Sequence, residues 1–189
     1  VMQWLSRELA EPEHQRAREC GGSVFAEMDK LAAKIPAGSE GVLFLPYMAG
    51  ERSPIWNPYA KGVFYGLDFT KTRAHFYRAA MEGVAYSLRH NLEIAAQAGA
   101  PVTQLHAMGG AANSRLWTQI KSDVTQLPIR SAKSDMATTL GAAMLAGVAT
   151  GVYKDYAQAV QQTVNMERSY VPNEENSSVY ERGFCDYLK

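Results

Sequence analysis

The residues best suited to chemistry lie between Gln104 and Gln126, in the sequence QLHAMGGAANSRLWTQIKSDVTQ. A short apolar run ends at Gly109-Gly110, and an amphipathic pattern begins after Ser114. A strand that turns into a helix at paired glycines leaves bare backbone N–H groups beside the positive end of the helix, which favours a phosphate or a nucleotide. Glycines also occupy such turns for structural reasons alone. The segment therefore predicts a nucleotide-binding turn, with a purely structural turn as the alternative.

A second candidate is residues 44–54, FLPYMAGERSP, which lead into IWNPYAKGVFYGLDF. The prolines and glycines of this stretch predict a structured loop. Glu51 and Arg52 lie within it, between Gly50 and Ser53-Pro54. They are interpreted either as a solvated pair or loop-holding salt bridge, or as residues that order a loop at a cleft.

Composition excludes several other classes of function. The chain has 189 residues with 19 basic and 19 acidic side chains, so its balanced charge indicates no nucleic-acid or anionic membrane surface. No apolar run approaches the roughly 20 residues that span a bilayer. The two cysteines are far apart, which is typical of reduced thiols in a cytosolic protein. The four histidines have no metal-ligand spacing, so no metal site made of side chains is expected: His14, His75, His90 and His106.

The elements before the glycine pair are predicted from apolar periodicity and punctuation. Val1 to Ala10 is predicted as a helix, and residues 11–20 as a turn or a second short helix. Val24 to Lys34 is predicted as a helix with four residues facing inward: Phe25, Met28, Leu31 and Ala32. Strands are predicted at Gly41–Leu45 and near Gly62–Leu67. The chain begins at Val1 inside a helix without a visible cap, which suggests that it was cut from something longer.

The longest predicted helix runs from Thr72 to Ala98, with Thr70 or Thr72 as its cap. Its apolar stripe at helical spacing consists of Phe76, Ala80, Val84, Leu88, Leu92 and Ala95. Gly83 costs about 1 kcal/mol against alanine in mid-helix, which predicts a packing reason for it. This helix is interpreted as structural.

The remaining pattern alternates between strands and helices. A strand at 105–108, a helix to Leu127 capped by Asn113 or Ser114, and a strand at 128–131 are predicted. A loop at 135–139 precedes a helix of small residues that should lie very close to a sheet. A helix from Asp155, a polar loop around Pro172 and a final helix with inward Tyr180, Phe184, Tyr187 and Leu188 complete the chain. This order is typical of the α/β class.

Several motifs together resemble the C-terminal domain of the FGGY carbohydrate kinases. They are FLPYMAGERSP with NPYAKGVFYGL, then AAMEGVAYSL, MGGAANSRLWTQIKSDV and TTLGAAMLAG, in this order. Within the family, the pattern is closest to xylulokinases, and gluconate and other pentulose kinases share much of it. The resemblance implies an actin-like (ribonuclease H-like) α/β domain over residues 1–189, truncated at its N-terminal end, as part of a two-domain enzyme.

The resemblance also implies site residues. Gly109 and Gly110 match the nucleotide-contacting motif. The contact asparagine of glycerol kinases aligns with Ser114, and Asn113 stands beside it. The start VMQWL is similar to the family helix whose glutamine approaches the ATP phosphates, which makes Gln3 a candidate.

The implied catalytic aspartate belongs to a segment before Val1. None of Asp68, Asp123 and Asp135 lies in the matching context. The fragment alone is therefore expected to be inactive.

The implied reaction is transfer of the ATP γ-phosphoryl group to a sugar hydroxyl, with a carboxylate as proton acceptor and Mg²⁺ on the phosphates. Xylulose is the first substrate prediction, with gluconate or another pentulose or polyol as the alternative. A rival interpretation is a non-catalytic actin-like module, such as a sugar-responsive regulator or a plain nucleotide-binding domain. The helices rich in small residues are compatible with close packing inside the domain or with a homodimer interface, and the sequence does not distinguish the two.

Overall fold

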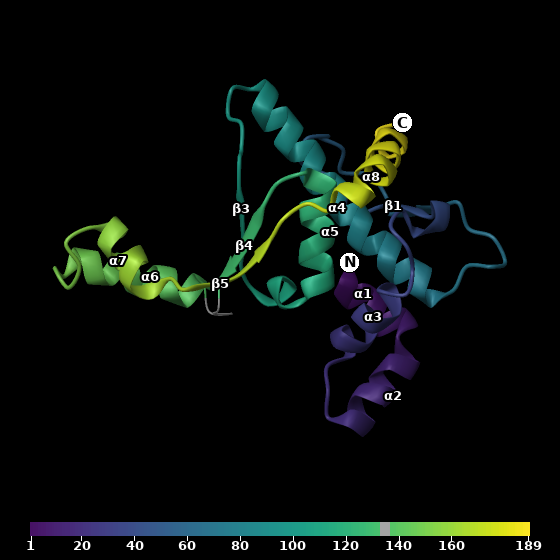
Figure 1. Ribbon diagram of the computed structural model, residues 1–189, viewed down its shortest axis with the longest axis horizontal. Coiled ribbons are helices and arrows are strands. Elements are labelled where there is room, and N and C mark those ends of the chain that lie inside the picture. Colours follow the sequence, from purple (N-terminus) through teal and green to yellow (C-terminus); the bar gives the residue numbers. More distant parts are fainter. Residues whose placement is uncertain (133–136) are drawn as a thin grey trace.

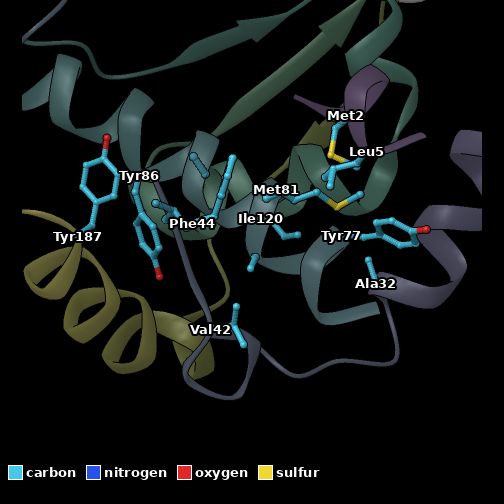
Figure 2. Packing of buried hydrophobic residues seen from close by; sticks show 14 of the residues in the cluster. Met2, Leu5, Ala32, Val42, Phe44, Tyr77, Met81, Tyr86, Ile120 and Tyr187 are labelled. Carbon is cyan, nitrogen blue, oxygen red and sulfur yellow. The ribbon is translucent and has the colours of Figure 1, made fainter. Parts of the chain in front are cut away.

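A computed structural model describes residues 1–132 and 137–189 (Figure 1). Of the predicted loop at 135–139, residues 135 and 136 lie outside the described residues, whereas the loop prediction was wrong for 137–139, because these form the first turn of helix α6 (Ala137–Ala149). One long helix, α4 (Arg73–Gln97), lies at the centre of the fold, and the first and last helices of the chain pack against it. The hydrophobic core (Figure 2) forms where α4 meets α1 (Met2–Leu9), α3 (Val24–Ala32), β1 (Leu43–Leu45), α5 (Arg115–Thr125) and α8 (Glu174–Tyr187).

Three helices begin the chain: α1 (Met2–Leu9), α2 (Glu11–Cys20) and α3 (Val24–Ala32). The charged stretch at 11–20 is therefore a helix, and Gly21 ends it with a φ of 63°. Met28 and Ala32 of α3 are fully buried, whereas Phe25 is 42% exposed. The inward prediction for Phe25 was wrong because periodicity sets the face of a helix, but not whether a neighbour reaches its first turn.

Two short strands, β1 (Leu43–Leu45) and β2 (Val63–Tyr65), form an antiparallel hairpin, which confirms both predicted strands. Phe44 lies opposite Phe64 in the register, and their rings stack with centroids 4.3 Å apart. A short turn, η1 (Ser39–Gly41), precedes β1. The hairpin therefore joins the core through one face of each strand.

Helix α4 begins at Thr72, which forms a capping box with His75. Its most buried apolar residues are Tyr77, Ala79, Ala80, Met81, Ala85 and Tyr86. Of the predicted stripe, only Ala80 is among them. The first half of α4 is packed on several sides, so a single apolar stripe does not identify all of its buried residues. A Cβ at Gly83 would collide with the Phe44 carbonyl oxygen, so the predicted packing reason is the close approach of β1.

The second sheet has the order β3-β4-β5, with β3 (Leu105–Ala107) parallel to β4 (Ile129–Ala132). Helix α5 (Arg115–Thr125) connects these two strands, as predicted. Strand β5 (Met166–Tyr170) pairs antiparallel with β4. The polar sequence of β5 was not recognised as a strand because its pairing partner, and not its apolar content, defines it.

Helices α6 (Ala137–Ala149) and α7 (Tyr156–Thr163) lie together at the left of Figure 1, away from the core. The prediction that α6 packs very close to a sheet was wrong: Leu145 is 59% exposed, and a cavity of about 630 Å³ separates α6 from β3 and β4. Small residues permit close packing but do not by themselves cause it. A Cβ at Gly147 would collide with the Tyr153 ring, so this small residue permits a close contact with Tyr153 and not with a sheet.

Helix α8 (Glu174–Tyr187) closes the core with Tyr180, Phe184 and Tyr187, as predicted, whereas Leu188 is exposed. The start of α8 is held to α5 by the buried Asp123 carboxylate. This carboxylate accepts hydrogen bonds from the Asn173 backbone N–H (2.9 Å) and the Asn176 side chain (2.8 Å). No helix in the described part of the chain is long and apolar enough to cross a membrane.

Candidate functional site

The glycine pair forms the predicted turn between strand and helix. Strand β3 ends at Ala107, Gly109 follows with φ 78° and ψ −177°, and the short helix η2 (Gly110–Asn113) leads into α5. The Ala112 N–H donates to the Gly109 carbonyl at 2.9 Å, and Ala112 is buried. The hydrogen bond and the buried Ala112 side chain therefore hold the turn in place, while Gly110 stays exposed.

The two glycines differ in what explains them. Gly109 has a positive φ that L side chains rarely adopt, so its backbone conformation accounts for it. Gly110 has no positive φ, and a Cβ added there would meet no atom within 4 Å among the described residues. Neither conformation nor packing within the described chain requires a glycine at 110. This leaves open backbone surface beside the start of α5, which a ligand could approach closely.

Ser114 is the N-cap of α5. Its hydroxyl oxygen accepts a hydrogen bond from the Trp117 N–H at 3.0 Å, and the hydroxyl donates to Asp29 on α3. Burial raises the pKa of Asp29, and the Ser114 hydrogen bond partly opposes this. Sequence patterns could not reveal Asp29, because it lies on a separate helix. Asn113, beside Ser114, is exposed.

Trp117 attaches the same helix to the core. Its indole N–H donates to the Met81 carbonyl of α4 at 3.0 Å. The ammonium group of Lys121 lies 4.1 Å from the centroid of the Trp117 ring, and burial lowers the pKa of Lys121. The (i, i+4) spacing of Trp117 and Lys121 was a usable sequence signal for this pair. These contacts hold the first turns of α5 rigidly under the glycine turn.

Gln3 lies in the first turn of α1 and is exposed. Its neighbours Val1 and Met2 pack in the same core cluster as Leu116 and Trp117 of α5. The structure therefore brings the starts of α1 and α5 to one cluster, with the N-terminus close to α5 in Figure 1.

The loop of Glu51 and Arg52 is ordered mainly by the glutamate. The Glu51 carboxylate accepts hydrogen bonds from the backbone N–H groups of Arg52 (2.7 Å) and Ser53 (3.2 Å). The Ser53 hydroxyl donates to the Asn91 side chain of α4 at 2.7 Å. Arg52 is exposed and forms no ion pair within residues 1–132 and 137–189. The salt-bridge interpretation is therefore not what orders this loop.

Replacing Ser114 by alanine is expected to lower the free energy of unfolding by about 1–2 kcal/mol, because a helix cap and the bond to Asp29 are both lost. Asn113→Ala should lower it by less than Ser114→Ala does, since Ser114 and not Asn113 is the N-cap of α5. Urea unfolding curves of both variants measure the difference. Ser23→Ala, which removes the exposed cap of α3, is the matched control for a cap alone. Equal losses at Asn113 and Ser114 would contradict the assigned roles.

Glu51→Ala is expected to lower the melting temperature, because two backbone N–H groups lose their acceptor. Arg52→Ala should leave it unchanged within about 1 °C, since an exposed side chain without an ion pair contributes little. Thermal unfolding followed by circular dichroism measures both. A larger loss for Arg52→Ala than for Glu51→Ala would restore the salt-bridge interpretation.

Two further features bear on ligands. The cavity between α6, α7 and the β3–β4 edge is mainly apolar, with His106 and Met108 at its β3 side. Within the described ranges, no three His, Cys, Asp or Glu side chains converge as metal ligands do. Both cysteines, Cys20 and Cys185, are exposed free thiols.

Comparison with known proteins defines the class. Residues 1–150 match the model of the C-terminal domain of the FGGY family of carbohydrate kinases. The chain is 35% identical over 163 residues to a xylulose kinase of Staphylococcus epidermidis, which covers 86% of this chain and 33% of that protein. It is also 35% identical over 181 residues to a gluconokinase of Bacillus subtilis, which covers 95% and 35%.

A solved xylulose kinase from Rhodospirillum rubrum superimposes with a TM-score of 0.82 at 32% identity, covering 98% of this chain and 36% of that one. The mixed α/β fold with its glycine turn is thus that of a carbohydrate-kinase domain. This chain belongs to the FGGY family of carbohydrate kinases and contains its C-terminal domain. It spans about a third of the length of the relatives it matches.

Proposed function

We propose that this chain forms the nucleotide-binding part of a sugar kinase that transfers the γ-phosphoryl group of ATP to a sugar hydroxyl. The observation that carries the proposal is Gly110, an exposed glycine that neither conformation nor packing within the described chain requires. A glycine at the start of a helix lets a nucleotide approach bare N–H groups at the positive helix end.

Five residues are proposed to contact the nucleotide: Gly109, Gly110, Asn113, Ser114 and Gln3. For Ser114, whose hydroxyl caps α5, we propose a contact through the backbone, and for Asn113, which is exposed at the turn, a contact through the side chain. The rigid attachment of α5 through Trp117 keeps these groups in place before the nucleotide binds. Pre-organisation of this kind reduces the entropic cost of binding.

Mg²⁺ is expected to accompany the nucleotide and to neutralise phosphate charge. Since the described residues offer no cluster of three ligands, we propose that phosphate oxygens and carboxylates outside this chain hold the ion. The carboxylate that accepts the sugar proton is likewise assigned outside this chain. Asp123 is occupied with α8, and Asp68 accepts hydrogen bonds from Thr70, so both have structural roles. Asp135 lies outside the described residues.

Xylulose is the proposed sugar, and gluconate or another pentulose or polyol is the second candidate. Both are supported by the relatives, since a xylulose kinase and a gluconokinase match at the same identity. The loop of Glu51 and Arg52 is proposed to lie at the cleft, with Arg52 exposed toward it. The cytoplasm, where ATP is abundant, is the proposed compartment.

Phosphorylation of a sugar panel by the protein that carries this chain tests the proposal. We expect ADP release with xylulose to exceed that with ribulose, gluconate and glycerol. The highest rate with gluconate would select the second candidate. Calorimetry with ADP distinguishes a kinase from the rival interpretation, a non-catalytic module. ADP binding without turnover of any sugar would indicate a non-catalytic nucleotide-binding module.

A further inference from the structure

A cavity of about 370 Å³ lies between the turn η1 and helix α8. Residues 37–43 form one wall, α8 forms another, and Glu82 and Tyr86 of α4 also line it. The lining combines four aliphatic side chains, three glycines and five polar or charged side chains. Small-molecule sites have this volume and this mixture of apolar walls with a few polar groups. The cavity shares no lining residue with the larger one beside α6.

The Tyr86 hydroxyl is the feature of this cavity that internal packing does not explain. Tyr86 is only 2% exposed, and Figure 2 shows its hydroxyl directed toward the space between α8 and Val42. The Tyr86 ring is well packed, because it contacts the rings of Tyr180, Phe184 and Tyr187. Its hydroxyl, by contrast, has no hydrogen-bond partner in the part of the chain that the structure describes. A buried donor without an acceptor is costly, so this hydroxyl is expected to serve a group inside the cavity.

Gly183 supports this interpretation from the side of α8. It lies inside the helix, where glycine is less favourable than alanine. A Cβ at Gly183 would collide with the Tyr86 hydroxyl, which is the atom that it would approach most closely. Phenylalanine at position 86 would keep the ring contacts, remove the closest of these approaches and leave no donor without an acceptor. The described chain therefore gains nothing from the hydroxyl by itself.

A second donor at the cavity is also without an acceptor. The three carboxylates of the lining each have a cationic partner: Glu40, Glu82 and Asp186. The Arg182 guanidinium has no ion pair among the described residues, although Asp186 lies one turn further along α8. The cavity therefore offers two free donors, the Tyr86 hydroxyl and the Arg182 guanidinium, beside carboxylate oxygens.

This arrangement favours a neutral ligand with several hydroxyl groups. A ligand hydroxyl can accept a hydrogen bond from Tyr86 or Arg182 and donate one to a carboxylate, so it suits both kinds of group. An anion would lie beside three carboxylates, and a cation would lie beside an unpaired guanidinium. Burial first, and the Glu82 carboxylate second, raise the pKa of Tyr86, which keeps its hydroxyl protonated as a donor.

We propose that the cavity between η1 and α8 binds a small neutral polyol, with Tyr86 and Arg182 as donors to its hydroxyl oxygens. This site is distinct from the glycine turn and does not depend on the proposed phosphoryl transfer.

Titration with xylitol tests the site, followed by methyl NMR of the protein that carries this chain. Val42, Leu43 and Val179 line the cavity, so their methyl signals should shift and saturate with a Kd on the order of 1–10 mM. The methyl signals of Val152, which follows α6, should not shift, since α6 lies away from α8 and β1 in Figure 1. Unchanged signals at the three lining residues would overturn the proposal and would indicate that another segment of the longer protein fills the cavity.

Tyr86→Phe removes only the unpartnered hydroxyl and should raise the Kd for xylitol about fivefold to tenfold. Arg182→Gln should raise it by at least as much, since a charged donor is lost. Tyr153→Phe is the matched control, because it removes a hydroxyl from a ring that packs against Gly147 of α6, and it should leave the Kd unchanged.

The melting temperature distinguishes a ligand contact from a structural role of the hydroxyl. Without xylitol, Tyr86→Phe should melt at the wild-type temperature or above, because its hydroxyl has no partner to lose in the described chain. A lower melting temperature of this variant, or an unchanged Kd, would overturn the assigned role.

Charged analogues test the class of the ligand. Xylonate and 1-amino-1-deoxyxylitol keep the five-carbon chain but carry a carboxylate or an ammonium group. Each should bind at least about tenfold more weakly than xylitol, because each meets like charge in the lining. Tighter binding of either analogue would overturn the neutral class.

Discussion

Replacing Gly110 by valine is expected to raise the KM for ATP about tenfold to one-hundredfold, with little change in the KM for the sugar. A branched side chain at this position would occupy the space through which a nucleotide reaches the backbone N–H groups at the start of α5. Steady-state kinetics with each substrate varied in turn, in the protein that carries this chain, measure both constants.

The substitution should not disturb folding, because a Cβ added at Gly110 meets no atom within 4 Å among the described residues. We therefore expect the melting temperature of Gly110→Val to match that of the wild type within a few degrees. Gly22 is the matched control: it also has no positive φ and no neighbour within 4 Å of an added Cβ. Gly22→Val should change neither KM. Equal effects of Gly110→Val on ATP and sugar would reject the nucleotide assignment.

Glu82→Ala is expected to produce the largest loss of stability, about 3–5 kcal/mol. Glu82 is 1% exposed and pairs with the buried Arg78 of the same helix at 2.7 Å. It also accepts hydrogen bonds from the Ser39 hydroxyl (2.7 Å), the Gly38 N–H (3.0 Å) and the Tyr180 hydroxyl (3.1 Å). Its removal would leave a buried guanidinium without its counter-charge and several donors without an acceptor.

Glu82 also holds an unusual turn. Residues 38–41 all have positive φ, including Ser39 and Glu40 at 50° each, a conformation that costs non-glycine residues of order 1–3 kcal/mol. Because Glu82 binds both Gly38 and Ser39, its loss should release the turn as well as α8, to which Tyr180 belongs. Burial first, and the Glu82 carboxylate second, raise the pKa of Tyr180, which keeps its hydroxyl protonated as a donor.

Guanidinium unfolding measures the effect, and the same helix supplies its control. Arg89 and Glu93 form an (i, i+4) pair like Arg78 and Glu82, but the Glu93 side chain is 42% exposed. Glu93→Ala should therefore cost less than about 1 kcal/mol. Similar losses at positions 82 and 93 would show that burial does not set the strength of this network.

The local elements were predictable because their signals are local. Paired glycines after an apolar run, followed by a capping serine, indicated the turn between β3 and α5. The long helix α4 was predicted from periodicity. The close packing at Gly83 was predicted from the cost of a glycine in mid-helix. The motifs that resemble FGGY kinases are likewise short segments, and the family match over residues 1–150 confirms that resemblance.

The features that were not predicted from the sequence depend on contacts between segments far apart in the chain. Strand β5 exists because β4 pairs with it, and its polar side chains gave no strand signal. Exposure of Phe25 depends on where neighbouring helices end, which no periodicity contains.

The same division holds at the candidate site. The sequence by itself determined a strand, a glycine turn and a capped helix, because hydrogen bonds and backbone preferences within a few residues decide them. Only the tertiary structure decided that Ser114 binds Asp29, that Trp117 binds Met81, and that Gly110 remains open. Burial and pairing are properties of the assembled chain, so these roles appear only when segments far apart in the sequence come together.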